Sequence, residues 1–548
     1  MSYGNVKVTY ASGGGLAPLA IDLSGDGLGG RTDATPYTAA GGTGRRSRSW
    51  RVGSYGPNIA ITYSLDELRN KSRDQVRKNP YAGAAKDKLV SNLVGVGIVP
   101  RSVAARATEG LDEDEAKRIK AEDSAFRAEL QRLWLAWTDE ADATGTLDFY
   151  GLQALAAAGM VEGGESFTRL RTRLLTDGMI VPLQLQVMEG DHCPHLKTGA
   201  APSPNERTET IRQGIQFNAI GRRTGYWLHR EHPGDGIVSS GFGEPVFVPA
   251  VDICHLFRPS RPGQDRGEPW LARALSTLYD LDAYLDAELQ RKKNAALFLG
   301  FVKRVGEDDG GAGIIGSSAG SGPIGSDPAD GEGIGDIEMD PGTLQVLADG
   351  EDVTFSSPPD VGPNFDMFVR EAKRRVAAAA GLLYEILSTD YGQLNDRTLR
   401  AALNDFRRAV ETWQHHLIVF QFCRPVWARW IDLAILSGAL KPPQGMTRQQ
   451  AGAVKWITPN WPYIHPVQDV EGKSLEIQSG FASRTQKVAE GGYDAEEIDR
   501  ENAADNERAD GLGLTYTSDG RQKVKPVAAA EPDDGPDDPA PPPNQEPA

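Results

Sequence analysis

Apolar positions recur at helical spacing early in the chain. Leu65, Leu68 and Val76 fall on one face of a predicted helix, for which Ser64 is the expected N-cap and Glu67 closes a capping box. The same spacing predicts helices over three further segments: 80–94, 113–137 and 147–157. The first part of the chain is therefore expected to be mainly helical.

Two boundary signals separate these helices. The residue before a proline avoids the helical conformation, so the first helix should end at Asn79, before Pro80. Gly95 and Gly97 should stop the second helix and lead into a strand.

Between Leu170 and Phe257 the pattern changes to short runs of β-branched and aromatic residues, which are typical of strands. The expected strands are Ile180 to Val187, Ile215 to Phe217, Gly225 to His229 and Pro245 to Val248. Helices and strands together predict an α+β fold that is mainly helical.

Long helical patterns return after residue 270. An apolar stripe from Leu271 to Leu289 predicts one helix, and a stripe from Phe365 to Ala380 predicts a second. The segment Gly381 to Arg397 breaks the pattern, and a long helix is expected from Leu399 to Gly438 with a kink at Pro425. Residues 466–510 have a polar helical pattern.

Other segments are too poor in apolar residues to fold alone. Residues 1–44 are expected to form a flexible arm, and the stretch from about 305 to 335, rich in Gly, Ser and Asp, should be a loop. From Glu531 onward the chain has Asp and Pro but no Lys or Arg, which predicts disorder.

The charge balance restricts the function. The chain has 548 residues and a formal net charge of −17, which disfavours tight non-specific binding to nucleic acid. An acidic wall nevertheless suits a channel along which DNA must slide. Three distant cysteines predict no disulfide framework, and neither a secretion signal nor a membrane span is expected.

Few residues suggest catalytic chemistry. The chain has no phosphate-binding loop of the GxxxxGK[ST] kind and no GxSxG nucleophile turn. Asp191, His192 and His195, with Glu189 and Cys193 beside them, are the one cluster of metal-ligand types, but their spacing matches no structural zinc pattern. We expect a polar turn here, and helix surface for His415-His416.

Many segments, in one collinear order from about residue 60 to 510, resemble the lambda family of tailed-bacteriophage portal proteins. Those that carry the resemblance include Asn79-Pro80-Tyr81-Ala82, Ser91 to Pro100, Gly214 to Asn218, His255-Leu256-Phe257-Arg258-Pro259, Arg261 to Gln264, Arg266-Gly267, Pro269-Trp270-Leu271, Asp390-Tyr391, Trp413-Gln414, Phe422 to Trp427 and Pro459-Asn460-Trp461-Pro462.

The resemblance implies a ring, normally a dodecamer, around a DNA channel. Its implied parts are an N-terminal arm at 1–50, a wing at 51–269, a first stem helix at 270–298, a clip with a Gly-rich insertion at 299–360, a second stem helix at 361–381, a tunnel loop at 382–397, a long kinked helix and more wing at 398–465, a crown at 466–510 and an acidic, Pro-rich tail at 511–548.

Two sets of residues are then expected to line the channel. They are Asp390, Tyr391, Gln393, Asn395 and Arg397 in the tunnel loop, and Arg291, Lys292, Lys293, Arg370, Lys373 and Arg374 on the stem helices. The implied partners are duplex DNA bound without sequence preference, the terminase large subunit, head-completion proteins, and capsid and scaffold proteins. The expected location is the capsid vertex of the virion, with the host cytoplasm during assembly.

The predicted function is therefore a DNA conduit without enzymatic activity, metal or cofactor. Two alternatives stay open at this point. One is a metal-dependent hydrolase or nuclease of the phage head, for which Asp191, His192 and His195 would be the metal nucleus. The other is a regulatory or scaffold-binding protein that uses its long helix as a partner surface.

Overall fold

The computed structural model describes residues 54–201, 209–235, 243–296, 300–304, 351–355, 365–392, 395–459, 461, 466–491, 493, 495–514 and 516. The expectations for the N-terminal arm, for the loop at 305–335 and for the tail from Glu531 fall outside these residues, as does Gln393.

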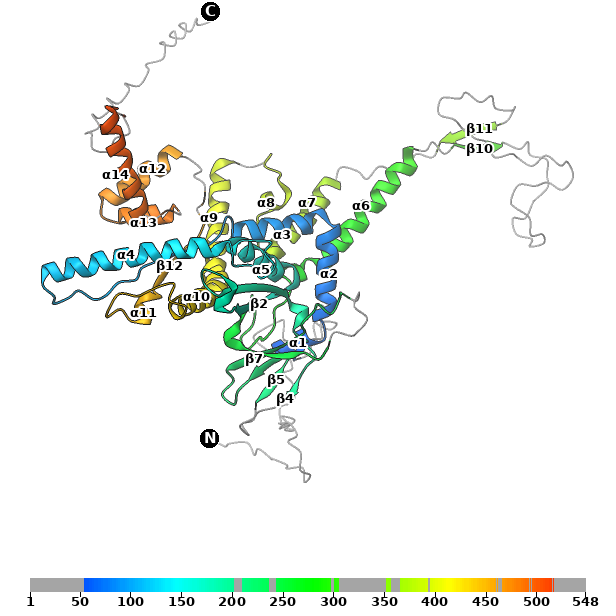
Figure 1. Ribbon diagram of the computed structural model, residues 1–548. Coiled ribbons are helices and arrows are strands. Elements are labelled where there is room, and N and C mark those ends of the chain that lie inside the picture. Colours follow the sequence, from blue (N-terminus) through cyan, green and yellow to red (C-terminus); the bar gives the residue numbers. More distant parts are fainter. Residues whose placement is uncertain are drawn as a thin grey trace, which may run out of the picture.

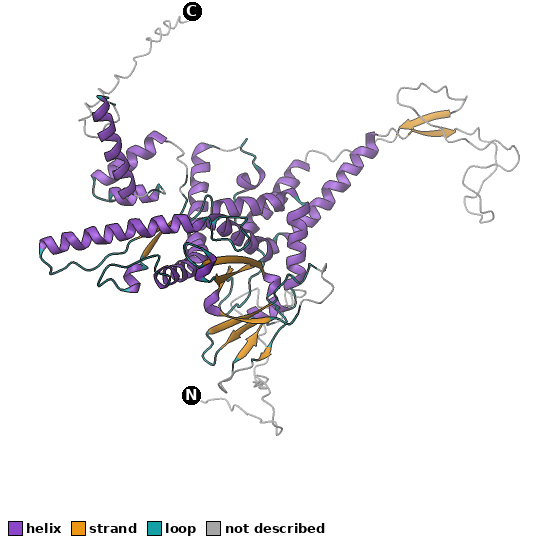
Figure 2. Cartoon of the chain, in the orientation of Figure 1, coloured by secondary structure: helices purple, strands orange, loops and turns teal. Residues whose placement is uncertain are grey.

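Helices form most of the described structure, and the two larger sheets lie on one side of them, while a separate two-stranded ribbon lies far from the body (Figure 2). In chain order the helices are α1 (Pro57–Thr62), α2 (Leu65–Lys78), α3 (Pro80–Leu93), α4 (Glu113–Thr138), α5 (Phe149–Gly163), α6 (Leu275–Ala296), α7 (Phe365–Ala380), α8 (Tyr384–Ser388), α9 (Asp396–Trp413), α10 (Arg424–Leu436), α11 (Arg448–Ala451), α12 (Pro466–Gln478), α13 (Arg484–Glu490) and α14 (Ala495–Leu512).

The strands make four antiparallel sheets. They are β1 (Val99–Ser102) with β12 (Val454–Ile457), β10 (Gly300–Arg304) with β11 (Glu351–Phe355), a three-stranded sheet of β3 (Leu183–Glu189), β2 (Glu165–Thr172) and β9 (Ile253–Phe257), and a five-stranded sheet of β4 (Gly199–Ala200), β5 (Thr210–Arg212), β6 (Ile215–Phe217), β7 (Arg223–Leu228) and β8 (Val246–Pro249). The predicted α+β fold, mainly helical, is confirmed.

The boundary between α2 and α3 lies where the proline predicts it. The Asn79 side chain accepts hydrogen bonds from the backbone N–H groups of Tyr81 and Ala82, and Pro80 occupies the first turn of α3. The capping box at Ser64 was a wrong prediction. Ser64 makes no side-chain cap because α1 leads directly into α2 and holds Ser64 in a helical conformation, while Glu67 pairs with Lys71.

Two helix starts also differ from the expectation. Helix α6 begins at Leu275 rather than near Leu271, because a 3-10 turn at Trp270–Arg273 follows Pro269 and buries Trp270 and Leu271 in the core. Helix α5 begins after Asp148, whose side chain caps it by accepting from the Gly151 N–H, and it continues to Gly163, beyond the predicted end.

A cluster of aromatic side chains forms the centre of the body. Trp134 lies within 5.2 Å, between ring centroids, of each of Trp137, Phe149, Trp427 and Trp430. These rings come from α4, α5 and α10, so segments far apart in sequence share one core. Helix α5 packs on the three-stranded sheet beside this core.

The predicted long helix exists, but its geometry is not α-helical throughout. A π-helical stretch, Gln414–Cys423, connects α9 to α10 immediately before Pro425. Proline lacks an N–H and its ring collides with the carbonyl one turn earlier, so a wider turn before Pro425 relieves the conflict. The predicted disturbance at this proline therefore takes the form of a π-helix.

Two parts extend away from the body. Helix α6 leads outward to the ribbon β10–β11 at its far end, and α7 lies beside the inner half of α6 (Figure 1). Helices α12, α13 and α14, with the described residues that connect them, form a separate group, which we call the crown helices because the family resemblance predicts a crown at 466–510 (Figure 1). No helix among the described residues is both long and apolar enough to span a bilayer.

Candidate functional site

The pair α6 and α7 positions most of the residues predicted to line a channel. A small apolar cluster of Leu281 from α6 with Val369 and Ala372 from α7 holds the two helices together. Tyr284 stacks against Phe365, at 5.9 Å between ring centroids, and lies tilted against Phe368, at 4.8 Å. The buried apolar part of this contact lies on the inner half of α6.

The three bases of α6 lie on its outer half. Arg291 donates to Glu288 one turn earlier, at 2.7 Å. Lys292 places its ammonium nitrogen 5.7 Å from the centre of the Phe365 ring. Lys293 lies exposed in the last turn, where a cation stabilises the helix dipole.

The three bases of α7 that are predicted to line the channel are each held by a neighbour within the chain, whereas the fourth base of this helix, Arg375, is exposed. Arg370 pairs with Asp366 at 2.9 Å, one turn earlier on the same helix. Lys373 lies 4.6 Å above the Tyr81 ring and Arg374 lies 5.5 Å from the Tyr384 ring. Only Arg374 of the three is exposed, so α7 presents less free positive charge than its sequence suggests.

The irregular segment after α7 contains the short helix α8 and a tight turn. Thr389 has a positive φ of 55°, and the Asp390 carboxylate accepts from the Gly392 N–H at 3.3 Å and the Tyr384 hydroxyl at 3.3 Å. Tyr391 is 55% exposed. The turn therefore presents an aromatic side chain on a polar loop.

Asn395 and Arg397 stand at the end of this segment. The Asn395 side chain accepts from the Arg397 N–H at 3.0 Å and so caps α9, which gives it a structural task within the chain. Arg397 is exposed. The structure thus brings Asp390, Tyr391, Asn395 and Arg397 into one segment.

A buried charge network, which the sequence reasoning missed, ties the two larger sheets to α2. The Glu165 carboxylate accepts from the Arg266 Nε at 2.8 and 3.0 Å, from the Gly267 N–H at 3.0 Å and from the guanidinium of Arg69. His255 lies 2.9 Å away through its Nε2. All four ionisable side chains are almost completely buried.

Arg266 also satisfies backbone carbonyls around the network. Its Nη1 donates to the carbonyl of Gln213 at 2.7 Å, and its Nη2 donates to those of Gly190 and Cys193 at 3.0 Å. A buried charge with this many partners fixes the relative position of several loops. Arg266-Gly267, a motif that carried the family resemblance, is therefore explained by architecture.

Opposing effects set the pKa values in this network. Burial favours the neutral form of Glu165, but Arg266 and Arg69 outweigh it and hold the pKa of that carboxyl well below its usual range. Burial lowers the pKa of His255 to about 4 even though Glu165 favours the charged imidazole. A neutral ring donates from Nε2 to Glu165 and leaves Nδ1 to accept from Arg223 at 3.3 Å.

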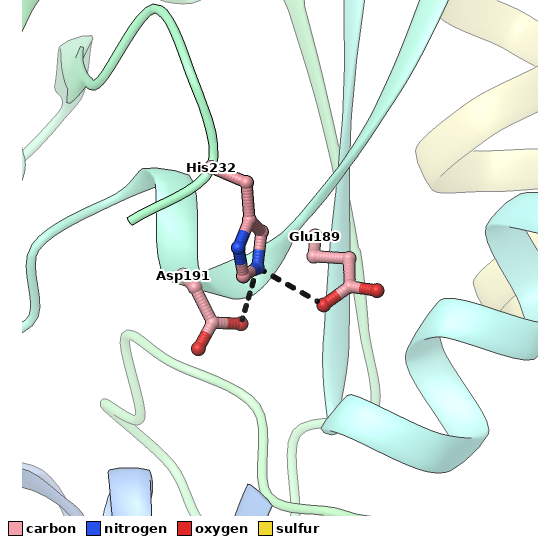
Figure 3. A group of neighbouring side chains, drawn as sticks. All are labelled: Glu189, Asp191 and His232. Atoms are coloured by element: carbon pink, nitrogen blue, oxygen red, sulfur yellow. Dashed lines mark ion pairs between the residues drawn. The ribbon is translucent and has the colours of Figure 1, made fainter. Parts of the chain in front are cut away.

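The candidate metal ligands are arranged differently from the prediction. Asp191 lies near Glu189 and His232 (Figure 3). The His232 Nε2 is 3.3 Å from the Glu189 carboxylate and 4.0 Å from the Asp191 carboxylate. The Arg73 guanidinium bonds both carboxylates. Burial would raise the pKa of Asp191, but the Arg73 hydrogen bonds outweigh it and lower that pKa. A protein cation therefore already compensates this acidic pair.

The other members of the predicted cluster face elsewhere. His195 has its Nδ1 3.3 Å from Asp66, and Cys193 is buried, which raises its pKa to about 11. His192 packs edge-to-face against His232. The structure therefore does not bring Asp191, His192 and His195 together as ligands of one metal ion. Elsewhere, His415 and His416 are exposed on the long helix, as expected.

Comparison with known proteins places this chain in one family. The family described as phage portal protein, lambda family, matches residues 43–414. The chain is 25% identical over 509 residues to the probable portal protein of Halomonas phage phiHAP-1, covering 90% of each chain. It is 21% identical over 515 residues to portal protein B of Escherichia phage lambda, covering 87% of this chain and 90% of that protein.

Solved structures give a more distant likeness. The neck of the native gene transfer agent particle, computed with C12 symmetry, is 15% identical with a TM-score of 0.41, covering 79% of this chain and 93% of that one. The neck of the empty particle, computed with C6 symmetry, has the same TM-score and covers 80% and 95%.

Proposed function

The chain belongs to the lambda family of phage portal proteins, and from this premise we propose that its copies form the ring at the capsid vertex through which DNA is packaged and ejected. The family makes twelve copies the expected number. The ring would act as a channel and connector, with the virion as its final location and the host cytoplasm as its place of assembly.

The observation that carries this proposal is the layout of α6, the ribbon β10–β11 and α7. Two antiparallel helices that pack together at their base and join through a distal ribbon suit a stem and a clip (Figure 1). The loop that follows α7 in the chain, in which Tyr391 is exposed, would then be the tunnel loop. On this reading Arg291, Lys292, Lys293, Arg370, Lys373 and Arg374 are the stem residues nearest to DNA.

The charges support passage rather than retention of DNA. Arg291 and Arg370 are paired with acids of their own helices, and the whole chain carries a net charge of −17. Fewer free cations mean fewer displaced counterions and weaker binding to phosphates. We propose duplex DNA as a sequence-independent cargo.

The ring would present separate surfaces to protein partners. The clip, around the ribbon β10–β11, would meet the terminase large subunit during packaging and head-completion proteins afterwards. The wing would contact capsid and scaffold proteins. The portal family is structural, and we propose that this chain likewise acts without catalysis.

Electron microscopy of the purified protein tests the ring. Particles with a central hole and rotational symmetry are expected. A strict monomer that cleaves DNA in a metal-dependent manner would favour the nuclease alternative, with Glu189, Asp191 and His232 as the group that could hold the ion.

Deletion of residues 390–395 tests the tunnel loop. Because these residues lie outside the α6–α7 contact, ring assembly should be unchanged while the yield of filled particles falls. The matched control is Asn395→Ala alone, which removes the cap of α9 but keeps the loop. Normal numbers of filled, infectious particles from the deletion would contradict the assignment.

A further inference from the structure

A row of arginines in this acidic chain has few counter-charges beside it. Arg169 and Arg171 alternate along β2, and Arg173 follows directly after its end, so the three side chains line one side of the three-stranded sheet, roughly 7 Å apart. Arg429 of α10 and Arg230 after β7 border the same surface. Against these five cations, the lining contains a single acid, Asp252, which pairs with Arg429 at 3.0 Å.

The arginines are held in place but not neutralised. Arg171 and Arg173 donate to the side-chain oxygens of Gln186 and Gln184 on β3, which are neutral partners. Within the described structure no hydrogen bond or ion pair engages the Arg169 guanidinium. Burial, and then the charges of Arg169 and Arg173, lower the pKa of Arg171, which shows that the row repels itself.

Two adjoining crevices follow this row. One, of about 300 Å³, lies between Arg169 and Arg171 on one side and apolar side chains of the five-stranded sheet on the other: Leu228, Val246 and Val248. The second, of about 230 Å³, continues along Arg173 to Arg429. Figure 1 shows β2 with α10 and the five-stranded sheet on neighbouring sides. The groove thus has one cationic wall and, over part of its length, one apolar wall.

We propose that this arginine groove binds an extended peptide segment of a partner protein in which acidic and apolar residues alternate. Successive side chains of an extended chain point to opposite sides with the same repeat as β2, so the carboxylate of every second residue can meet an arginine. The residues between them would then face Leu228, Val246 and Val248. Arginine and carboxylate form charge-assisted, bidentate pairs, which suits this recognition.

The apolar wall favours a peptide over nucleic acid. Leu228 and Val248 are already buried in the core of the five-stranded sheet, but Val246 is 40% exposed, and a sugar-phosphate backbone would satisfy the arginines while it offered Val246 no apolar partner. The arginine row is also half-buried, whereas contacts with duplex DNA need cations that project to the surface. DNA is therefore an outcome of the test rather than the proposed occupant.

The test uses the full-length protein and a fluorescently labelled synthetic peptide of alternating glutamate and valine. Fluorescence anisotropy should show binding that weakens as salt rises. A matching peptide with glutamine in place of glutamate should not bind, because it lacks the carboxylates. Labelled duplex DNA of similar total charge is the third probe.

The decisive variant, R169E/R171E/R173E, reverses the charge of all three arginines in the row. It should weaken binding of the acidic peptide roughly tenfold or more, because three charge-assisted contacts become repulsive. The matched control, K117E/R118E/K120E, makes the same charge change on the exposed outer half of α4 and should leave binding unchanged. Circular dichroism melting of both variants identifies any loss of folding.

If the triple reversal fails to fold, R169E alone keeps the proposal testable, since that side chain has no partner to lose. Equal weakening by the row variant and the α4 control would show a general charge effect and overturn the proposal. Binding of DNA but not of the acidic peptide to this groove would overturn it too, as would binding of neither probe.

Discussion

At the scale of single residues, Glu165 is a buried carboxylate on which several partners converge. It has no exposed surface, and two arginines, a histidine and a backbone N–H converge on it. Removing one partner of a buried ion pair leaves the other charge without compensation, which costs far more than losing an exposed pair. The stability of the region around the two larger sheets should therefore depend on this carboxylate.

Glu165→Gln should lower the free energy of unfolding by about 3–5 kcal/mol, because Arg266 and Arg69 stay buried against a neutral amide. Urea denaturation followed by circular dichroism measures the loss. Glu189→Gln on the adjacent strand is the control: its carboxylate is 55% exposed, so the loss should stay below about 1 kcal/mol. Similar losses for both variants would show that the network does not act as described.

His255 should make the protein less stable in mild acid. Its pKa is about 4 in the folded chain against about 6.5 when unfolded, so the folded state binds fewer protons between these values. Stability is therefore complete above about pH 6.5 and falls as the pH drops, by roughly 2 kcal/mol at pH 5 from this group. The lowered pKa of Glu165 acts in the same direction but at lower pH, below its unfolded value.

His255→Gln keeps a donor for Glu165 but does not titrate, so it should flatten the dependence of the melting temperature on pH between about 6.5 and 5. Burial also lowers the pKa values of His192 and His195, which leaves a remaining slope in the variant. Melting curves of both proteins at matched pH values measure the difference. An unchanged slope would mean that His255 is not neutral in the folded protein.

Sequence reasoning at this scale succeeded where the signal is local. The helix boundary at Asn79 and the stop at Gly95 depend on residues a few positions away, and both were predicted, although the side-chain cap that Asn79 provides was not. The Glu165 network joins residues separated by 90 or more positions, so no local spacing marks it. The capping box at Ser64 failed because the preceding helix, a feature outside the motif, sets the conformation of Ser64.

At the scale of elements, α6 changes character along its length. Its inner apolar residues, such as Leu281, are buried against α7, whereas Leu289 on the same stripe is 53% exposed. One copy of the chain therefore stabilises only the base of this helix. The outer half should tolerate changes that the inner half does not.

Leu281→Ala should cost about 2–5 kcal/mol, because it leaves a cavity between α6 and α7. Leu289→Ala, the same change two turns outward, should cost less than about 0.5 kcal/mol in the isolated chain. Thermal unfolding of both variants measures the contrast. Equal losses of stability for the two variants would mean that Leu289 is buried against a part of the protein other than α7.

Periodicity predicted the elements better than their ends. The stripe from Phe365 to Ala380 predicted α7 with its observed bounds, because most of its apolar residues, among them Val369, Ala372 and Val376, are buried by the helix, although Phe368 is 54% exposed. The stripe on α6 extended too far back, because Leu271 is buried from a 3-10 turn with similar spacing. The π-helix before Pro425 was not predicted in form, since the proline marks a disturbance of the helix without determining its geometry.

At the scale of the whole molecule, the body and the crown helices differ in how they are stabilised. The body has a continuous core around Trp134 and Trp430, while Ala495 is the one buried apolar residue among the described parts of α12–α14. Large apolar side chains of the crown helices lie exposed: Val467, Val470, Leu475, Phe481, Tyr493 and Leu512. Within one copy, Glu496 approaches Arg127 and Arg101 of the body at 3.6 and 4.0 Å.

Such partly exposed ion pairs contribute little, so removal of residues 466–548 should change the stability of the body by less than about 1 kcal/mol. Tryptophan fluorescence reports this directly, because all ten tryptophans precede residue 466. A urea transition of the body that moves to clearly lower concentration would mean that the crown helices stabilise it within one copy. We expect the midpoint of the tryptophan transition to be unchanged while the rings dissociate at a lower urea concentration. This outcome would show that the exposed apolar side chains of the crown helices stabilise contacts between copies.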